Sequence, residues 1–382
     1  MEHPTRVYLD NAAKAPVDPT VLREFLAVHQ MQGNASSLHA EGRALAGILQ
    51  DARLRVARHF NARAEEVVFC ATGSEASTLA IVGLVEAMGG SGHIITTPIE
   101  HPSILAAIEH AVAHGWSVSY VPVDGQGMVD PAHVARLVTP ETKLISIGFA
   151  NHEIGTIQPI GACIRAVRER CRAEGMTPPY FHTDACQAIA YRQIDVHGLG
   201  IDMMTINGTK IHAPAGCAAL LVRSGIRLAP QVFGGDQERG LRAGTENVAG
   251  AVALARALEL AIPEHVLSVQ TLRDYLFGQL PKYVKGHLSL GATGDDRIAH
   301  NVCFALPGER SEDMVLRLDA MGFAVSSGSA CTAHTTGPSH VVRAIGVPEA
   351  YAGGVLRVTL SRMNTQAEVD AFLEALGALV TK

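Results

Sequence analysis

The sequence predicts an α/β protein with a large, mainly parallel seven-stranded sheet flanked by helices, and a smaller C-terminal α+β domain. Three observations support this prediction. A chain of 382 residues is long enough for two domains. Short apolar strands without polar alternation are separated by helical stretches, which is typical of a parallel sheet buried on both faces. The last third of the chain then changes to a different order of helices and strands.

The elements follow from the spacing of apolar residues. The strands of the large sheet are expected at 67–69, 93–96, 118–121, 144–147, 180–183, 203–206 and 218–222. Helical spacing occurs near 20–31, 42–60, 74–88, 102–114, 131–138 and 160–174, and two long helical stretches follow from about 248. The small domain is expected to hold strands near 286–291, 300–305 and 355–360, with helices near 311–321 and 365–380. We therefore predict an N-terminal arm and large domain over 1–260 and a small domain over 261–382.

The composition excludes several classes of protein. Hydrophobic residues make up 47% and the formal net charge is −6, which is typical of a soluble globular protein and offers no basic surface for nucleic acid. The seven cysteines are scattered, without a C-x-x-C pair or zinc-finger spacing, so we expect a reducing compartment and no metal site. No leader pattern and no membrane-spanning apolar run occur, so we expect a cytoplasmic protein.

Polar residues follow several predicted strands at their carboxyl ends, where α/β sheets bind ligands. Gly73 and Ser74 follow the first strand and begin a helix, so they can offer N–H groups and a hydroxyl to a phosphate. The same turn is also typical of an ordinary helix cap. His101 follows the second strand and places an imidazole at the start of the next helix.

Two further strands end in residues with a more specific meaning. Asp184 follows the strand at 180–183, where a carboxylate can cap a turn or hold a cationic ring nitrogen. Lys210 comes shortly after the strand at 203–206, and a lysine in a crevice is costly unless it is paired or covalently occupied. A phosphate turn, a stacking imidazole, a carboxylate for a pyridinium and an imine-forming lysine together indicate pyridoxal 5'-phosphate (PLP) as cofactor.

Motifs along nearly the whole chain extend this interpretation. The two most specific are Glu238–Thr245 and Ser326–Cys331. With them the chain resembles the NifS/IscS-type cysteine desulfurases, which are class-V aminotransferase-like members of the fold-type I PLP-dependent enzymes. The other matching segments are Tyr8–Ala13, Gly33–Asn34, Ser36–Ser37, Glu100–His101, Asn151–Gly155, His182–Gln187, Thr209–Ile211 and Gly234–Gly235.

The resemblance implies a role for each matching residue of the cofactor site. Lys210 would bind the cofactor covalently and move protons, and Asp184 would keep the pyridine nitrogen protonated. His101 would stack on the ring and act in acid–base steps. Gln187 would reach the phenolic oxygen of the ring. The phosphate would be held by Gly73, Ser74, Asn207 and Thr209, and by Thr245 from the other subunit of a homodimer.

The substrate and the nucleophile are also implied by the resemblance. Arg357 would bind the carboxylate of L-cysteine, and Asn34 matches a second substrate-binding position. Cys331 takes the position of the nucleophile, in a segment whose small polar residues favour an exposed, mobile loop of the small domain. The other cysteines lie in or beside apolar strands or in a helical stretch, where a free cysteine behaves as a small hydrophobe.

Two positions depart from the family pattern. Thr209 stands where a histidine usually precedes the imine-forming lysine, and its hydroxyl can still donate to a phosphate. His152 stands where the family has a second asparagine that touches the ring oxygen and the substrate. Imidazole can donate or accept there, but its larger size affects substrate preference and rate.

The implied activity is the conversion of L-cysteine to L-alanine, with the sulfur captured as a persulfide on Cys331 and passed to an acceptor protein that the sequence does not identify. Iron–sulfur cluster assembly and thiolation are both open as pathways. One alternative is a selenocysteine lyase or another class-V PLP enzyme. Another is a catalytically silent sulfur carrier or assembly subunit, which the substitutions at 152 and 209 suggest. No metal, direct nucleic acid partner or membrane is expected.

Overall fold

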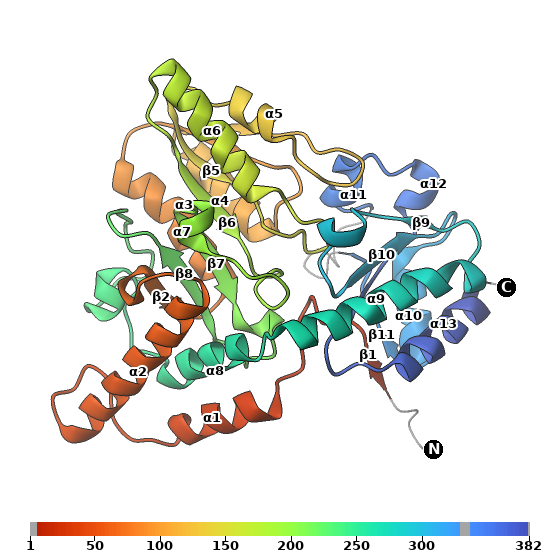
Figure 1. Ribbon diagram of the computed structural model, residues 1–382, viewed down its shortest axis with the longest axis horizontal. Helices are drawn as coiled ribbons and strands as arrows, with labels where there is room; N and C mark the ends of the chain where they lie inside the picture. Colours follow the sequence, from red (N-terminus) through yellow and green to blue (C-terminus); the bar gives the residue numbers. More distant parts are fainter. Residues whose placement is uncertain (1–5, 329–336, 381–382) are drawn as a thin grey trace.

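A computed structural model describes residues 6–328 and 337–380, and it confirms the predicted large sheet (Figure 1). Seven strands run in the order β2-β8-β7-β6-β5-β3-β4. Only β8 runs antiparallel to its neighbours, β2 and β7; the other pairs are parallel. The strands are β2 (Val67–Cys70), β3 (His93–Thr96), β4 (Ser117–Tyr120), β5 (Thr142–Ser146), β6 (Tyr180–Asp184), β7 (Met203–Asn207) and β8 (Ala218–Val222).

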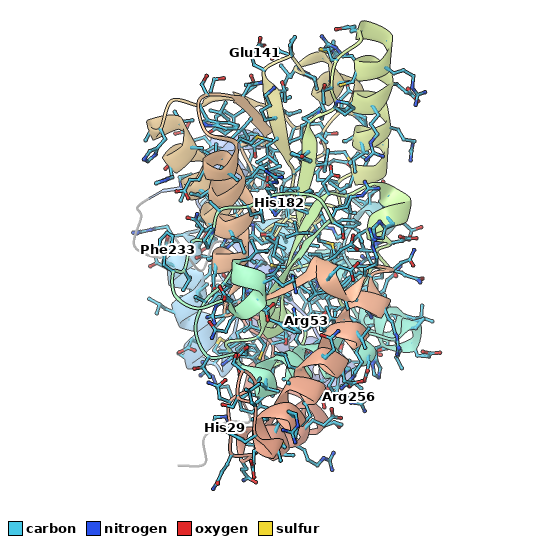
Figure 2. All side chains as sticks on the ribbon, turned by 90° about the vertical axis from the view of Figure 1, so that its left-hand side faces the viewer. His29, Arg53, Glu141, His182, Phe233 and Arg256 are labelled. Carbon is cyan, nitrogen blue, oxygen red and sulfur yellow. The ribbon has the colours of Figure 1, made fainter. Side chains whose placement is uncertain are left out.

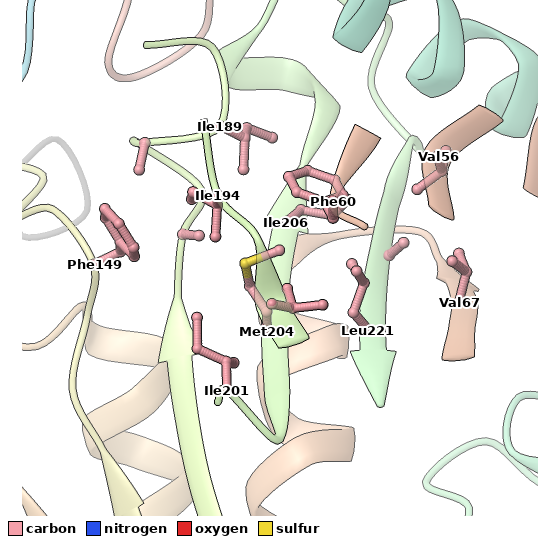
Figure 3. Close-up of a cluster of buried hydrophobic side chains, with 14 of the residues drawn as sticks. Val56, Phe60, Val67, Phe149, Ile189, Ile194, Ile201, Met204, Ile206 and Leu221 are labelled. Carbon is pink, nitrogen blue, oxygen red and sulfur yellow. The ribbon is translucent and has the colours of Figure 1, made fainter. Parts of the chain in front are cut away.

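Helices cover both faces of this sheet, because successive strand residues point to opposite faces. Met204 and Leu221 lie in one core, and their neighbours Met203 and Leu220 lie in the other. Figure 3 shows the first core, where Phe60 lies beside Met204 and Ile206. This core is covered by α1 (Pro19–His29), α2 (Ala40–His59), α5 (Pro131–Arg136), α6 (Ile160–Glu174) and α8 (Val248–Glu259), and the second core by α3 (Gly73–Met88) and α4 (Pro102–Ala113).

The C-terminal part forms a second sheet with its own core. Its order is β12-β10-β9, and all pairs are antiparallel. The strands are β9 (Leu288–Ser289), β10 (Asn301–Ala305) and β12 (Val355–Thr359), and the covering helices are α9 (Pro263–Tyr283), α10 (Ser311–Ala320) and α13 (Gln366–Val380). The domain border near residue 260 stays a prediction; in the structure α8 ends at Glu259 and α9 begins at Pro263.

The N-terminal arm begins on the C-terminal core, where its first strand forms a separate two-stranded sheet. Strand β1 (Val7–Tyr8) pairs in parallel with β11 (Phe323–Ala324), and the two lie side by side in Figure 1. Val7 and Leu9 are buried in the C-terminal core. The arm thereby carries the residues that follow it to the space between the two sheets.

The differences from the predicted elements are mostly at their ends. The predicted strand at 286–291 is wrong over most of its length, because only Leu288–Ser289 pair with β10. Elements that the apolar pattern missed are very short, so they cannot show a period. They are β1, β11, α7 (Val196–Leu199), α11 (His340–Ala344) and α12 (Glu349–Ala352). Among the described residues, no helix combines the length and apolar character needed to cross a bilayer.

Candidate active site

A cavity of about 310 Å³ lies between the two sheets, at the carboxyl ends of the parallel strands. It brings together nine of the residues that the sequence predicts for the site. Eight come from the ends of five strands of the large sheet and one from the second sheet, and they are Gly73, Ser74, His101, His152, Asp184, Gln187, Asn207, Lys210 and Arg357. The position of the cavity matches the general location of ligand sites in α/β sheets.

Lys210 reaches the cavity from a single 3-10 turn, Gly208–Lys210, that directly follows β7. The side chain is half-buried, and Nζ donates to the carbonyl oxygen of Ala13 at 2.5 Å. The neighbouring carbonyl of Ala12 accepts from Nε2 of Gln187 at 3.1 Å. The arm residues therefore hold both predicted cofactor ligands at the cavity wall.

Asp184 and His101 face the cavity from the ends of β6 and β3. Asp184 ends β6, and its Oδ1 accepts from the backbone N–H of Cys186 at 2.9 Å. His101 caps α4, and its Nδ1 accepts from the backbone N–H of Ser103 at 3.1 Å. Burial lowers the pKa of His101, although the negative charge of Asp184 opposes this effect. A neutral imidazole of this kind can stack on an aromatic ring and can accept a proton.

The predicted phosphate site has the form of a helix N-terminus. Gly73 and Ser74 begin α3, whose first N–H groups point out of the helix. A Cβ atom at Gly73 would lie 3.1 Å from Sγ of Cys186 and 3.4 Å from Nδ2 of Asn207, so a side chain would fill this concave turn. Thr209 does not line the cavity; its hydroxyl donates to Oδ1 of Asn207 at 3.0 Å and fixes that amide.

Arg357 enters from the second sheet, where it lies at the centre of β12. Its guanidinium is buried, donates to Oδ1 of Asp10 at 2.8 Å and donates to the carbonyl oxygen of His152 at 2.9 Å. Its Nε is buried and has no hydrogen-bond partner among the described residues. Because a guanidinium presents a planar fork of N–H donors that matches a carboxylate, Arg357 can bind a carboxylate at the cavity wall.

Besides Thr209, two predicted site residues lie away from this cavity. Thr245 lines a second cavity of about 170 Å³, together with Phe69 and Arg242. Asn34 does not line the first cavity, and its Oδ1 accepts from the backbone N–H of Ser36 at 2.8 Å. Cys331 lies outside the described residues.

Not every polar residue of the matching motifs serves the cavity. His182, at the centre of the molecule in Figure 2, is buried in the sheet between the hydroxyls of Ser146 and Thr205, at 2.9 and 3.1 Å. Burial lowers its pKa to about 4. His182 is therefore a neutral core residue that joins β5, β6 and β7.

Several cavity residues had no predicted role. Glu100 is fully buried beside His101, and burial, with the charge of Asp184 as a further cause, raises its pKa to about 7. Asn151 and Cys186 also line the cavity. All three belong to sequence motifs that also contain predicted site residues. Their residue types alone did not indicate a role in the site. Asp10, the partner of Arg357, lies in the motif at 8–13 and likewise had no assigned role.

The residues present fit PLP. The lysine, the carboxylate and the imidazole meet in one cavity, and the concave turn at Gly73 leaves room for a phosphate group beside N–H donors. Within the part of the chain that the structure describes, no group of three or more His, Cys, Asp or Glu side chains is arranged to hold a metal ion. The cavity is therefore suited to an organic phosphate cofactor.

Comparison with known proteins leads to the same family. The model of the aminotransferase class-V family matches residues 7–372. A cysteine desulfurase IscS of Methanosarcina thermophila is 40% identical over 381 residues, which are 98% of this chain and 92% of that protein.

Solved structures of similar proteins share the fold over the same range. A NifS-like protein superposes with a TM-score of 0.90 at 30% identity, covering 99% of this chain and 100% of that chain. A structure of SspA in complex with cysteine gives a TM-score of 0.81 at 30% identity and covers 94% and 100%. The chain therefore belongs to the class-V aminotransferase family and, within it, to the NifS/IscS-type cysteine desulfurases.

Proposed function

We propose that this protein is a PLP-dependent cysteine desulfurase that converts L-cysteine to L-alanine and captures the sulfur as a persulfide on Cys331. In this reaction the carbon–sulfur bond of the substrate breaks and a sulfur–sulfur bond forms on Cys331. The electron pair of the broken carbon–sulfur bond stays with the carbon, which takes up a proton in place of the one that the Cys331 thiol loses. The carbon is thereby reduced as the sulfur is oxidised, so no external oxidant is needed.

One observation carries the proposal. Lys210, Asp184 and His101 come from three different strand ends and line a single cavity, to which the second sheet adds Arg357. A structural lysine or a capping aspartate would have no reason to meet the other two. Together they provide a covalent anchor, an anion for a pyridinium and a base, which is the set of groups that PLP chemistry uses.

The chain's own residues then have distinct tasks. When bound, PLP supplies an electron sink for the α-carbon of the substrate. We assign to Asp184 the task of holding a proton at the pyridine nitrogen, and to Lys210 that of holding the cofactor and moving protons at Nζ. His101 would stack on the ring and accept protons, and Gln187 would contact the phenolic oxygen. Gly73, Ser74 and Asn207 would hold the phosphate, and Thr209 would support it by fixing the Asn207 amide through its hydroxyl.

Substrate binding is assigned to Arg357, with His152 as a further contributor; the predicted role of Asn34 stays a prediction, because Asn34 does not line this cavity. The guanidinium of Arg357 is anchored by Asp10, which orients it and leaves donors for a carboxylate. SspA has been solved in complex with cysteine, and its fold matches this chain. That likeness supports cysteine as the substrate here.

The assignment of the nucleophile to Cys331 is supported by the state of the other thiols. Cys70, Cys163, Cys171, Cys186, Cys217 and Cys303 are all buried. Burial raises the pKa of each of them, to about 12 for Cys163, Cys217 and Cys303. A thiol with a raised pKa is a poor nucleophile because the thiolate is the reactive form.

We further propose that the protein acts as a homodimer in the cytoplasm and passes sulfur to an acceptor protein, for iron–sulfur cluster assembly or thiolation. Thr245 lines a cavity different from the one that holds Lys210, which supports its use by a neighbouring subunit. Phe233, at the margin of the molecule in Figure 2, is 82% exposed, and Leu38 is 91% exposed. We assign both side chains to the proposed subunit interface, where a second copy of the chain would cover them.

Incubation with L-cysteine tests the function directly. The PLP-loaded protein should form alanine and protein-bound sulfane sulfur without a reductant, and should turn over repeatedly with dithiothreitol. Cys331→Ser should abolish the persulfide and sustained alanine formation, whereas the matched variant Cys171→Ala should retain both. Alanine formation from cysteine at the wild-type rate by Cys331→Ser would contradict the assignment, and turnover of selenocysteine alone would favour a lyase.

A further inference from the structure

His152 of the cavity wall and the next residue, Glu153, each have a buried polar atom without a hydrogen-bond partner among the described residues. These atoms are Nε2 of His152 and Oε1 of Glu153, and they lie 3.6 Å apart. The side chains are only 12% and 1% exposed. At 3.6 Å the two atoms are within ion-pair distance but beyond a normal hydrogen bond. Because buried unpaired polar atoms are costly, a small approach that pairs them through one proton is favoured.

The second oxygen of Glu153 is already occupied. Oγ of Ser339 donates to Oε2 at 2.6 Å. A Cβ atom at Gly328 would lie 3.2 Å from the same oxygen, so the backbone there packs against the carboxyl group. Glu153 therefore contacts Gly328 and Ser339 through Oε2, and only Oε1 is left for His152.

Groups that carry positive charge when protonated lie around the ring of His152. The His101 ring lies at 5.1 Å in an edge contact, and the His340 ring lies at 6.4 Å. Burial lowers the pKa of His152 well below its usual value, and the charges of His101, Arg357, His340 and Lys210 lower it further. The imidazole therefore stays neutral, with one proton on one of its two nitrogens.

Different groups face Glu153. Burial raises the pKa of its carboxyl group, whereas the hydrogen bond from Ser339 and the charges of His340 and Arg357 lower it. Cys303 of β10 also faces this carboxyl, and the charge of Glu153 contributes to raising the pKa of that thiol. Within the pair, Glu153 is therefore the residue that gains or loses a proton.

We propose that Glu153 sets the tautomer of His152 and thereby decides whether the imidazole donates or accepts a hydrogen bond in the cavity. With Glu153 ionised, Nε2–H donates to Oε1 and Nδ1 is an acceptor. With Glu153 protonated, its O–H donates to Nε2 and Nδ1 carries the ring proton. In the change from the second state to the first, the carboxyl group releases one proton to water, and the ring proton moves from Nδ1 to Nε2.

The consequence concerns what the cavity binds, and it rests on the proposed function. His152 lines the cavity, and the contact of Nε2 with Glu153 leaves Nδ1 as the nitrogen that can meet a bound molecule. A phenolate oxygen or a substrate carboxylate requires the donor form, Nδ1–H. Glu153 therefore acts as a positioning residue. It takes up a proton when His152 binds such a ligand, although Glu153 itself does not touch the ligand.

Nitrogen NMR of the ¹⁵N-histidine-labelled, PLP-loaded protein tests the inference, because the two neutral tautomers have different nitrogen shifts. The His152 signals are assigned by their loss in His152→Asn. In the wild type they should change from the Nδ1–H form to the Nε2–H form as pH rises, whereas in Glu153→Gln they should stay in one form. A single tautomer across the pH range in the wild type would overturn the inference, as would the same change in Glu153→Gln.

A second variant keeps the test decisive if Glu153→Gln folds poorly. Ser339→Ala removes the hydrogen bond that favours the carboxylate, so the midpoint of the change should rise by about one pH unit. Thr365→Ala is a matched control, because Thr365 Oγ1 accepts from the N–H of Glu368 at the start of α13, away from the cavity. An unchanged midpoint in Ser339→Ala would contradict the inference.

Alanine release measured on the same samples separates the two proposals. Alanine formation with a tautomer that does not change would refute the role of Glu153 and leave the proposed function intact. A pH-dependent tautomer without alanine formation would refute the proposed function and support the proton pair.

Discussion

At the scale of single residues, some of the side chains that line the cavity could be placed from the sequence and others could not. Lys210, Asp184 and His101 follow predicted strands, so their approximate place could be predicted from the sequence. The pairing of Arg357 with Asp10 could not, because these residues are far apart in the chain and meet only after the arm crosses to the second sheet. The contact between His152 and Glu153 depends on side-chain orientation, which no sequence pattern contains.

Glu100 gives a stability prediction with a definite sign. Its pKa rises from 4.5 to about 7 in the folded protein, so the folded state keeps a proton that the unfolded state has lost. The free energy of unfolding should therefore fall as pH rises through this window, by about 3 kcal/mol in total. The glutamine of Glu100→Gln does not titrate, so this variant should not lose free energy of unfolding through this group as pH rises.

Urea unfolding at about pH 5 and about pH 8 measures this effect. The stability of Glu100→Gln relative to the wild type should increase between the two pH values. The same difference at both would show that Glu100 is ionised throughout, and the explanation from burial would then be wrong.

At the scale of secondary-structure elements, dense apolar runs predicted the sheet because each buried strand needs an uninterrupted apolar segment. The short segments between elements were not predictable in the same way. Glu238 and Arg239 have φ values of 47° and 60°, a left-handed backbone that few non-glycine residues adopt. This turn is held by contacts distant in sequence: Arg53 of α2 binds Glu238 through two hydrogen bonds of 2.7 and 2.6 Å.

The buried pair of Arg53 and Glu238 leads to a prediction about this turn. Both side chains are less than a tenth exposed. Glu238→Gln leaves the guanidinium buried without its anion, so the free energy of unfolding should fall by about 3–5 kcal/mol. Arg53→Met combined with Glu238→Gln removes both charges and should cost much less.

Denaturant titration of the two variants decides the matter. The difference between the single and the double variant is the informative quantity. If the double variant is as unstable as the single variant, the unpaired charge of Arg53 is not the cause of the instability.

At the scale of the whole molecule, the active cavity exists because two sheets and the arm meet. The seven-stranded sheet supplies the groups proposed to bind the cofactor, and β12 supplies Arg357. Thr245 stands apart from this cavity within one chain, although the sequence motif that contains it resembles a cofactor-binding one. The proposed homodimer accounts for this separation, since each cavity would then take Thr245 from the partner.

Mixed dimers test the shared site. Dimers of Lys210→Ala and of Thr245→Ala should each be impaired at limiting PLP. When subunits are exchanged, a mixed dimer has one cavity with both changes and one with neither, so alanine formation should recover toward half of the wild-type rate per mixed dimer. No recovery despite verified exchange would mean that Thr245 acts within its own chain or not at all.

Reduction with borohydride tests whether Lys210 binds the cofactor covalently. The PLP-loaded protein is reduced, digested and examined by mass spectrometry. If Lys210 holds the cofactor, a phosphopyridoxyl group should be found on the peptide that contains Lys210, and no labelled peptide should be found in Lys210→Ala. A label on another lysine, or a reduced protein without any label, would contradict it.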